Sequence, residues 1–408
     1  MKTVVLITTG QPSVNPRIVK EADALQAAGY AVTVLYCYWI KWADAADDKL
    51  LKNVHWNYKL VGGNPSKNKL LYFFTKARFK LNIALNHKFG NKFLFAERSQ
   101  ARCFDELLAA AKSIKADWYI GHNLGALPIV VKAAAYHHAF TGFDFEDYHR
   151  EENNNEPVFT KKRVVFLEEK YISHLSYISA SSPHITARVH ANFPSFSKPV
   201  ITILNCFPVT QRPKKINVFA KSLQLFWFSQ TVGKNRGLEA VISALKQLNN
   251  SSIHITLAGR CDREMTTYLK KNAGEIKDCI HLAGIIDPGQ LPAFAAGFDV
   301  GLATEMVTPL NRNICLTNKI FTYLVAGNCI LASDTEAQTD FINSYNGIGM
   351  LYRNNDVRDL AEKIRTLCND SNILNQCKEK AFTLASATLN WENESKKLLQ
   401  TISSITFK

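Results

Sequence analysis

The sequence lacks any long apolar run, and this absence excludes one class of protein. No stretch of about 18 or more uncharged apolar residues occurs, so no helix is expected to span a bilayer. The N-terminal stretch MKTVVLITTG is too short for a secretory signal and ends in glycine, so it is better interpreted as a strand. We therefore predict a cytoplasmic protein, associated at most with the inner face of the cytoplasmic membrane.

Several ligand-binding patterns are also missing. The nine cysteines are scattered, with no CxxC pair and no His/Cys cluster at zinc spacing, which favours reduced thiols over disulfides or a structural metal. The first loop has one glycine and no GxGxxG, so a dinucleotide cofactor is not expected. We predict no cofactor and no metal.

What is present is a globular, basic composition. The 408 residues are 47% hydrophobic, enough for two cores of roughly 200 residues each. The net charge of +14 favours an anionic partner, such as a nucleotide, a nucleic acid or an acidic lipid surface. Strands alternate with helices, so the predicted fold is α/β with two Rossmann-like parallel sheets. The predicted boundaries are a first domain at 1–208, a linker at 209–217, a second domain at 218–388 and a returning C-terminal helix at 389–408.

The chain opens with a βαβ pattern. A β-branched strand is predicted at 3–8, a helix at 18–28 and a second strand at 30–36. Residues 39–52 are polar and are predicted to be turn-like. A single amphipathic helix is predicted at 98–113.

The stretch 311–334 is predicted to be a loop, a short helix, a glycine stop and a buried strand. Thr317 is expected to cap the first helical N–H groups, and Gly327 to allow the left-handed turn that ends the helix. A helix N-terminus at the carboxyl ends of parallel strands suits a phosphate. The loop 229–237, with Lys234 and Arg236 before another helix, has the same character. The alternative is an ordinary crossover with nothing bound.

A second group of candidates follows two strands of the first domain. His122 comes directly after a strand, and Glu146 and Asp147 follow the next one. If the sheet is parallel, Asp144, His149 and Arg150 also lie close to His122. The alternative for His122 is a loop histidine bonded to the backbone.

Residues 66–95 combine basic and aromatic side chains and contain no acidic residue. This composition suits the headgroup region of an anionic membrane, so peripheral contact is predicted. The alternative is that the aromatic residues belong to the core and the lysines are merely solvated. A nucleic-acid partner is not expected, because no stacking-platform motif is present.

The order of several segments resembles that of GT-B glycosyltransferases. They are SVNPRIVKEADALQAAGYAVTVL, GHNLGALP, GFDFEDYHR, FSQTVGKNRGLEAVISAL, LAGR and LTNKIFTYLVAGNCILASD. Together they are similar to family 4 glycosyltransferases, which are retaining enzymes with two Rossmann-like domains facing a cleft. The resemblance implies a nucleoside diphosphate sugar as co-substrate, a glycan or lipid-linked acceptor, and a role in cell-surface polysaccharide or glycoconjugate synthesis.

The resemblance also implies site residues. The catalytic candidates are His122, Glu146, Asp147 and Arg236. The candidates for binding the donor and its phosphates are Gly10, Gln230, Lys234, Arg236, Arg260, Glu305, Thr317, Asn318 and Lys319. The chain departs from the family pattern at Ile314 and Thr322, where relatives have two glutamates, at Gln230, where they have arginine, and at Glu146, where they have histidine.

Two other functions fit the same pattern. The missing glutamates favour a GT-B shell that has lost activity and serves as a scaffold. A nucleotide-sugar epimerase of the same architecture is the other alternative, because one fold hosts several chemistries.

Overall fold

The computed structural model describes residues 1–216 and 221–406, and its internal contacts divide the chain into two units. Unit 1 contains residues 1–203 and the chain from Ser395 onward, and unit 2 is Leu204–Glu394. The division thus falls before the predicted linker at 209–217. Residue 217 and the predicted domain start at 218 lie outside the described residues.

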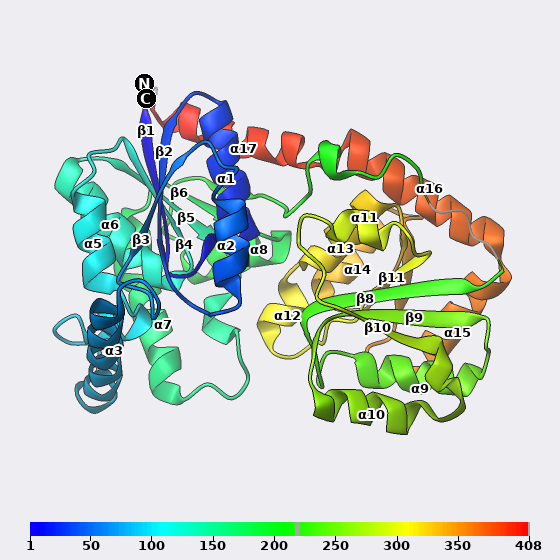
Figure 1. Ribbon diagram of the computed structural model, residues 1–408. Helices are drawn as coiled ribbons and strands as arrows, with labels where there is room; N and C mark the ends of the chain where they lie inside the picture. The colour runs from blue at the N-terminus through cyan, green and yellow to red at the C-terminus, as the bar shows by residue number, and fades with distance from the viewer. Residues whose placement is uncertain (217–220, 407–408) are drawn as a thin grey trace. The chain divides into compact units, whose positions relative to one another are not determined.

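Unit 1 is built on a parallel sheet with strand order β3-β2-β1-β4-β5-β6-β7 (Figure 1). Its strands are β1 (Thr3–Thr8), β2 (Ala31–Cys37), β3 (Asn57–Val61), β4 (Trp118–His122), β5 (Phe140–Phe145), β6 (Tyr177–Ala180) and β7 (Val200–Thr202). Its helices are α1 (Pro16–Ala27), α2 (Ala43–Leu50), α3 (Lys69–Phe89), α4 (Phe95–Gln100), α5 (Phe104–Lys112), α6 (Leu127–His137), α7 (Val158–Tyr171) and α8 (Pro183–Asn192).

Unit 2 repeats this plan with strand order β10-β9-β8-β11-β12-β13. Its strands are β8 (Leu223–Val232), β9 (Ile253–Cys261), β10 (Ile280–Gly284), β11 (Val300–Ala303), β12 (Cys329–Ser333) and β13 (Gly349–Tyr352). Its helices are α9 (Leu238–Leu248), α10 (Arg263–Ala273), α11 (Leu291–Ala295), α12 (Leu310–Ile314), α13 (Asn318–Ala326), α14 (Glu336–Ser344), α15 (Val357–Asn369) and α16 (Ser371–Ala387), and α17 (Trp391–Thr406) begins in unit 2 and continues into unit 1.

Both sheets confirm the predicted α/β class with two parallel sheets. In each, the chain starts in the middle, builds outward to one edge and then crosses to the other, so a topological switch point lies between the first and fourth strands. In unit 1 the switch point lies between β1 and β4, and in unit 2 between β8 and β11. Loops that leave two such strands separate to opposite faces of the sheet and leave room for a ligand.

The central strands are apolar on both faces because helices cover both faces of each sheet (Figure 1). In β1, the four residues from Val4 to Ile7 are all buried. In unit 2, Gly301 of β11 allows α13 to approach closely, since a Cβ at Gly301 would lie 2.1 Å from Cγ of Tyr323. The Tyr323 hydroxyl then donates to the carbonyls of Phe226 and Leu302, at 3.3 and 3.1 Å.

The structure corrects two predicted elements of unit 1. Residues 39–52 are not simply turn-like but contain α2, whose Asp47 is buried and accepts from Gln11 Nε2 at 2.9 Å. The single helix predicted at 98–113 is divided into α4 and α5, with Ala101 extended between them. Arg102, at this break, donates to the backbone carbonyls of Gly62 and Tyr38, so a tertiary contact accompanies the break.

Gly301→Ala should destabilise unit 2, because the added methyl group overlaps the buried Tyr323 ring. Overpacking of this kind costs about 1–3 kcal/mol of unfolding free energy. Gly289→Ala is the control, since its nearest neighbour would be Asp287 Oδ1 at 3.4 Å. Urea denaturation of both variants measures the difference; equal stabilities would contradict the close approach.

Candidate active site

The register of the sheet in unit 1 brings four polar side chains into one row. Thr8 pairs with His122, His122 with Asp144, and Asp144 with Ser179, across β1, β4, β5 and β6. Residues in register on parallel strands point to the same face, and all four lie at or near the carboxyl ends of their strands. Because β1 and β4 flank the switch point, the row lies where an open α/β sheet binds ligands.

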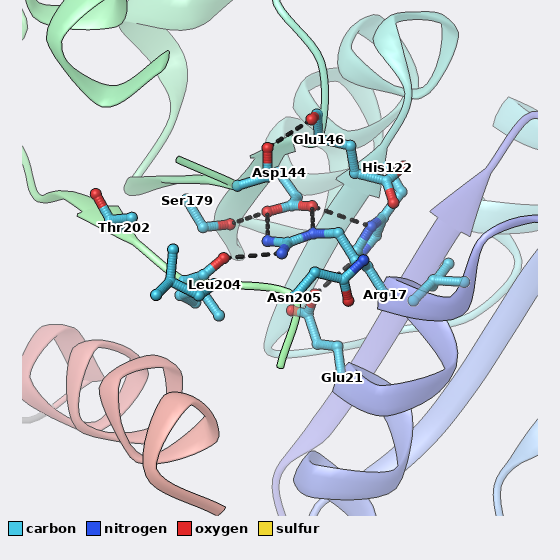
Figure 2. Close-up of polar contacts among 12 residues, drawn as sticks. Arg17, Glu21, His122, Asp144, Glu146, Ser179, Thr202, Leu204 and Asn205 are labelled. Atoms are coloured by element: carbon cyan, nitrogen blue, oxygen red, sulfur yellow. Dashed lines mark hydrogen bonds and ion pairs between the residues drawn. The ribbon is translucent and has the colours of Figure 1, made fainter. Parts of the chain in front are cut away.

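Helix α1 places two charged side chains over this row (Figure 2). Arg17 and Glu21 are four residues apart, so they project from the same face of α1. Arg17 donates from Nε and Nη2 to the two oxygens of Asp144, each at 2.7 Å, and from Nη1 to the carbonyl of Ile203 at 2.8 Å. Ser179 Oγ donates to the same carboxylate at 2.6 Å. The Asp144 carboxylate thus accepts three hydrogen bonds, two from Arg17 and one from Ser179.

Burial and charge oppose each other in this cluster. Burial, the largest single effect, raises the pKa of Asp144, but Arg17, His122 and Ser179 together lower it by more, so the net shift is downward. Burial would likewise lower the pKa of Arg17, yet Asp144 raises it overall. The pair therefore stays ionised although both side chains are buried.

His122 lies between two carboxylates. Its Nε2 is 2.8 Å from Glu21 Oε2, and its Nδ1 is 3.6 Å from Asp144 Oδ2. Burial lowers the pKa of His122, but Glu21 and Asp144 raise it, and the net shift is upward. The imidazole has no exposed surface, so in this arrangement it positions its neighbours and does not face solvent.

Glu146 is the carboxylate of this group that is less deeply buried. Its Oε2 accepts from Asn15 Nδ2 at 2.7 Å and from Asn123 Nδ2 at 3.3 Å. Burial raises the pKa of Glu146 to about 7, and the nearby Asp144 and Asp147 add to the rise against opposing His122 and Arg17. Glu146 therefore exchanges a proton near neutral pH, as a general base or an acceptor-orienting group must.

One set of these side chains has metal-ligand spacing. His122, Asp144 and Glu146 each offer a ligand atom, and these atoms lie within 4.8 Å of one another. However, Arg17 already bonds both oxygens of Asp144, and Glu21 bonds Nε2 of His122. A guanidinium thus supplies the positive charge that a cation would bring. The prediction that the site uses no metal stays a prediction.

In unit 2, the loop between β8 and α9 is fixed to the end of β11. Thr304 Oγ1 donates to the carbonyl of Arg236 at 2.6 Å and accepts from Trp227 Nε1 at 2.9 Å. Gly237 has a φ of +78°, and a Cβ there would lie 2.6 Å from Thr304 Cβ, so glycine is needed at this close approach. Gly237 is the N-cap of α9 and has no side chain to cap the helix.

Two arginines meet beside this loop. Arg236 donates from Nη1 to Ser229 Oγ at 2.9 Å, and Arg312 donates from Nη1 to the carbonyl of Asn235 at 3.0 Å. Burial lowers the pKa of Arg236, and the charge of Arg312 lowers it further. Two guanidinium groups that repel each other at the carboxyl edge of a parallel sheet are stabilised by an anion between them.

Glu305, which follows β11, bonds to residues at the start of α13. Its Oε1 accepts from Lys319 Nζ at 2.7 Å and from Thr317 Oγ1 at 3.2 Å. Burial, the largest single effect, raises the pKa of Glu305, but Lys319, Arg312 and Thr317 together lower it by more, so the carboxylate stays ionised. The sequence predicted that the Thr317 hydroxyl caps α13, and this prediction is wrong. The hydroxyl makes no cap bond because it donates to Glu305 instead. No side chain among the described residues caps the N-terminus of α13.

Comparison with known proteins identifies this architecture. Residues 223–370, which contain the loops around Arg236 and Glu305, match the family described as Glycosyl transferases group 1. A search of curated protein sequences found no match.

Solved structures resemble the chain over nearly its whole length. The Anabaena protein HepE in complex with UDP has a TM-score of 0.68 at 16% identity, covering 99% of this chain and 100% of that one. Sucrose-phosphate synthase from Thermosynechococcus elongatus has a TM-score of 0.72 at 12% identity, covering 100% and 99%. A mutant of S. aureus TarM, in complex with fondaparinux, alpha-GlcNAc-glycerol and UDP, has a TM-score of 0.68 at 11% identity, covering 98% and 99%. The chain therefore has the GT-B fold, and its residues 223–370 match the group 1 glycosyltransferase family.

Some of the predicted donor residues lie together and others do not. Glu305, Thr317 and Lys319 form one bonded group, and Arg236 lies near it, since the charge of Glu305 raises the pKa of Arg236. Asn318 is the first residue of α13, and its side chain accepts from Asn205.

The remaining donor candidates lie elsewhere. Lys234 is exposed and pairs with Glu264 of α10 at 3.3 Å. Gln230 and Arg260 are exposed on β8 and β9, and Gln230 lies at a break in the register of these strands, not in the following loop. Gly10 belongs to unit 1, where its N–H donates to Thr8 Oγ1 at 3.2 Å.

The predicted convergence around His122 is partly wrong. Asp144 and Glu146 do join His122, but His149 pairs with Glu152 at 3.4 Å and Arg150 with Glu168 at 2.5 Å. Asp147 follows Glu146 and is partly buried; its charge raises the pKa of Glu146. The cation of the cluster is Arg17.

Sequence reasoning missed three charged residues of the two clusters. Arg17 and Glu21 lie on α1, where their i, i+4 spacing on an otherwise apolar face was an available signal. Arg312 lies in the stretch 311–334, and its charge beside the predicted anion site could have been noted. Their partners are distant in sequence, as for Arg17 and Asp144, which are 127 positions apart.

Arg17→Met should lower the free energy of unfolding by about 3–5 kcal/mol, because it leaves the Asp144 carboxylate buried without its cation. Since the folded pKa of Asp144 is lowered, the difference should shrink as pH falls below about 4. The control is Arg358→Met on the exposed start of α15. Urea titration measures both variants; a loss no larger than that of the control would show that the pair contributes nothing.

Glu146→Gln should change how stability depends on pH. Because the folded pKa of Glu146 is raised to about 7 from 4.5, folded wild type binds a proton that the unfolded chain releases between these values. Wild type should therefore lose about 1–3 kcal/mol relative to the Gln variant as pH rises from about 4.5 to 7. Exposed Glu169→Gln is the control. A difference independent of pH would contradict the raised pKa.

Proposed function

We propose that the protein transfers a sugar from a nucleoside diphosphate sugar to a glycan or lipid-linked acceptor. The observation that supports this most is the adjacent pair of guanidinium groups, Arg236 and Arg312, within the segment that matches group 1 glycosyltransferases. HepE and TarM, which share the fold, are in complex with UDP. We propose retention of configuration and membership of family 4 on the motif resemblance.

In this proposal the cations of unit 2 stabilise the leaving diphosphate. Negative charge develops on the phosphate oxygens as the bond to the sugar breaks, so donors fixed beforehand lower the barrier. Arg236, Arg312 and the uncapped N–H groups of α13 supply such donors. Because these are protein groups, we propose that no metal is needed.

Ile314 and Thr322 stand where relatives have two glutamates, so another carboxylate is needed to bind the ribose, and Glu305 is available. It is the ionised carboxylate at the carboxyl edge of β11, and Lys319 and Thr317 fix its position. We propose that Glu305 accepts hydrogen bonds from the donor's ribose. For unit 1, we propose that Glu146, with Asp147 beside it, orients the acceptor hydroxyl, and that His122 positions these groups.

Arg236→Ala should lower turnover of the nucleotide sugar by about 100- to 1,000-fold, as expected for removal of one preorganised donor. The fold should be preserved, because Thr304 bonds the backbone carbonyl at 236 and not the side chain. Steady-state transfer or hydrolysis of UDP-glucose and related donors measures the loss, and circular dichroism checks the fold. Exposed Arg358→Ala is the matched control. Unchanged turnover would exclude the proposed role.

The two alternatives predict different results. An inactive scaffold with a closed site should bind none of UDP, GDP and ADP in calorimetry, whereas a transferase should bind one. A nucleotide-sugar epimerase should convert its donor without any acceptor, which product analysis reveals.

We also propose that the protein works at the inner face of the cytoplasmic membrane. No helix within residues 1–216 and 221–406 is long and apolar enough to cross a membrane, so contact would be peripheral. The support for the proposal is the basic and aromatic composition of residues 66–95.

A further inference from the structure

Helix α3 carries its large apolar side chains on its outer surface. Leu70 is 88% exposed, Phe74 61%, Phe73 and Leu81 58% each, and Phe89 49%. A surface helix of a globular protein normally turns such residues toward the core. In Figure 1, α3 lies beyond the ends of the strands of unit 1, and most of its length projects away from the sheet.

The inner surface of α3 is polar instead. Thr75, Asn82 and Asn86 are its buried residues. Thr75 Oγ1 donates to the carbonyl of Gly62 at 3.2 Å, and Asn86 Nδ2 donates to the carbonyl of Gly90 at 3.1 Å. Since buried polar groups are costly unless bonded, the bond from Thr75 to Gly62 stabilises α3 in this orientation, whereas the bond from Asn86 to Gly90 lies within the end of the helix itself. The helix is therefore inverted relative to an ordinary amphipathic helix, and it is held that way by specific bonds.

The lysines of α3 lie along one flank of its apolar line. With about 100° between successive residues, Leu70, Phe74 and Leu81 lie within about 40° of one another on the helix surface. Lys69, Lys76 and Lys80 lie about 120° to one side of that line. Long lysine side chains beside an apolar stripe can keep their charges in the headgroup layer while the stripe enters the acyl boundary.

The opposite flank of α3 is anchored to the body of unit 1. Arg78 pairs with Glu106 at 2.5 Å and with Asp105 at 3.3 Å on α5. Arg102 donates to Thr75 and places its guanidinium 4.9 Å from the ring centroid of Tyr72. The exposed line is consequently a fixed surface of the unit and not a loosely attached segment.

The segment that carries this surface has charge of one sign. No acidic residue occurs between positions 66 and 96, and Lys88 and Lys92 continue the basic character past the end of the apolar line. At the same end, His87 contacts the ring of Phe159 at a centroid distance of 4.9 Å, next to exposed Val158 (68%) and Lys162 at the start of α7. A hollow of ≈560 Å³, lined in part by His87 and Lys162, separates the two helices. This hollow suits an anionic headgroup.

We propose that α3 is the docking element of the protein on an anionic bilayer, with Leu70, Phe74 and Leu81 inserted at the headgroup boundary and Lys69, Lys76 and Lys80 against lipid phosphates. The inference rests on the proposed membrane location and adds the element and the face that make the contact. A second copy of the chain is a poorer occupant, since a symmetric α3–α3 contact would bring like charges together.

The test is cosedimentation with vesicles of phosphatidylcholine, with and without phosphatidylglycerol. Wild type should bind only the vesicles with phosphatidylglycerol. The variant Lys69→Glu/Lys76→Glu/Lys80→Glu should lose at least about a hundredfold in partitioning, because each cation near the surface contributes roughly fivefold. The control Lys270→Glu/Lys271→Glu/Lys277→Glu changes the net charge equally on exposed positions of unit 2 and should bind nearly as wild type does.

The apolar line is tested separately. Phe74→Ser should lower partitioning about tenfold or more, whereas Tyr136→Ser, at a residue 62% exposed on α6, should not. Turnover of the nucleotide sugar in solution should be unchanged in all these variants, so loss of docking is distinguished from loss of sugar transfer.

Three outcomes would overturn the inference. If wild type does not bind the anionic vesicles, both the membrane location and the docking role of α3 fail. If the two lysine variants lose binding equally, the membrane contact is a bulk charge effect and only the role of α3 fails. If light scattering without vesicles shows a dimer that Phe74→Ser dissociates, the surface is an interface between copies of the chain.

Discussion

The parallel register of each sheet is the constraint on which both polar clusters depend. Parallel strands bring their carboxyl ends to one edge, and a reversal of strand order beside the first strand separates the loops there. In unit 1 this places His122, Asp144 and Ser179 in one row. In unit 2 it brings Arg236, after β8, next to Thr304 and Glu305, after β11. The same topology thus produces two sites of different chemistry.

The two clusters differ in their balance of charge. In unit 1 the groups around His122 are mainly carboxylates, and Arg17 holds Asp144 ionised while Glu146 keeps its proton up to about pH 7. In unit 2 the neighbouring groups are mainly cationic: the charge of Arg312 lowers the pKa of Arg236, and the single carboxylate of Glu305 raises it. In the proposed function, the first cluster orients the acceptor hydroxyl and the second stabilises the leaving diphosphate.

In helix α3, the amino-acid composition does not determine which side chains face outward. Residues 66–95 are basic and aromatic in either orientation of the helix. The bonds of Thr75 to Gly62 and Arg102, and the ion pairs of Arg78, hold the helix with its aromatic residues outward. The interpretation that the aromatic residues belong to the core therefore fails for Phe73 and Phe74, which are more than half exposed.

The sequence alone determined the α/β class, the strand at 3–8 and the helix, glycine stop and strand that follow Thr317, because hydrophobic periodicity and turn residues act over a few positions. The tertiary structure decided which charges meet. Arg17 finds Asp144 across 127 positions, and the Thr317 hydroxyl bonds to Glu305 in preference to capping its own helix. These pairings depend on which strands lie side by side and on how far burial removes water from the charged groups. A local sequence pattern determines neither.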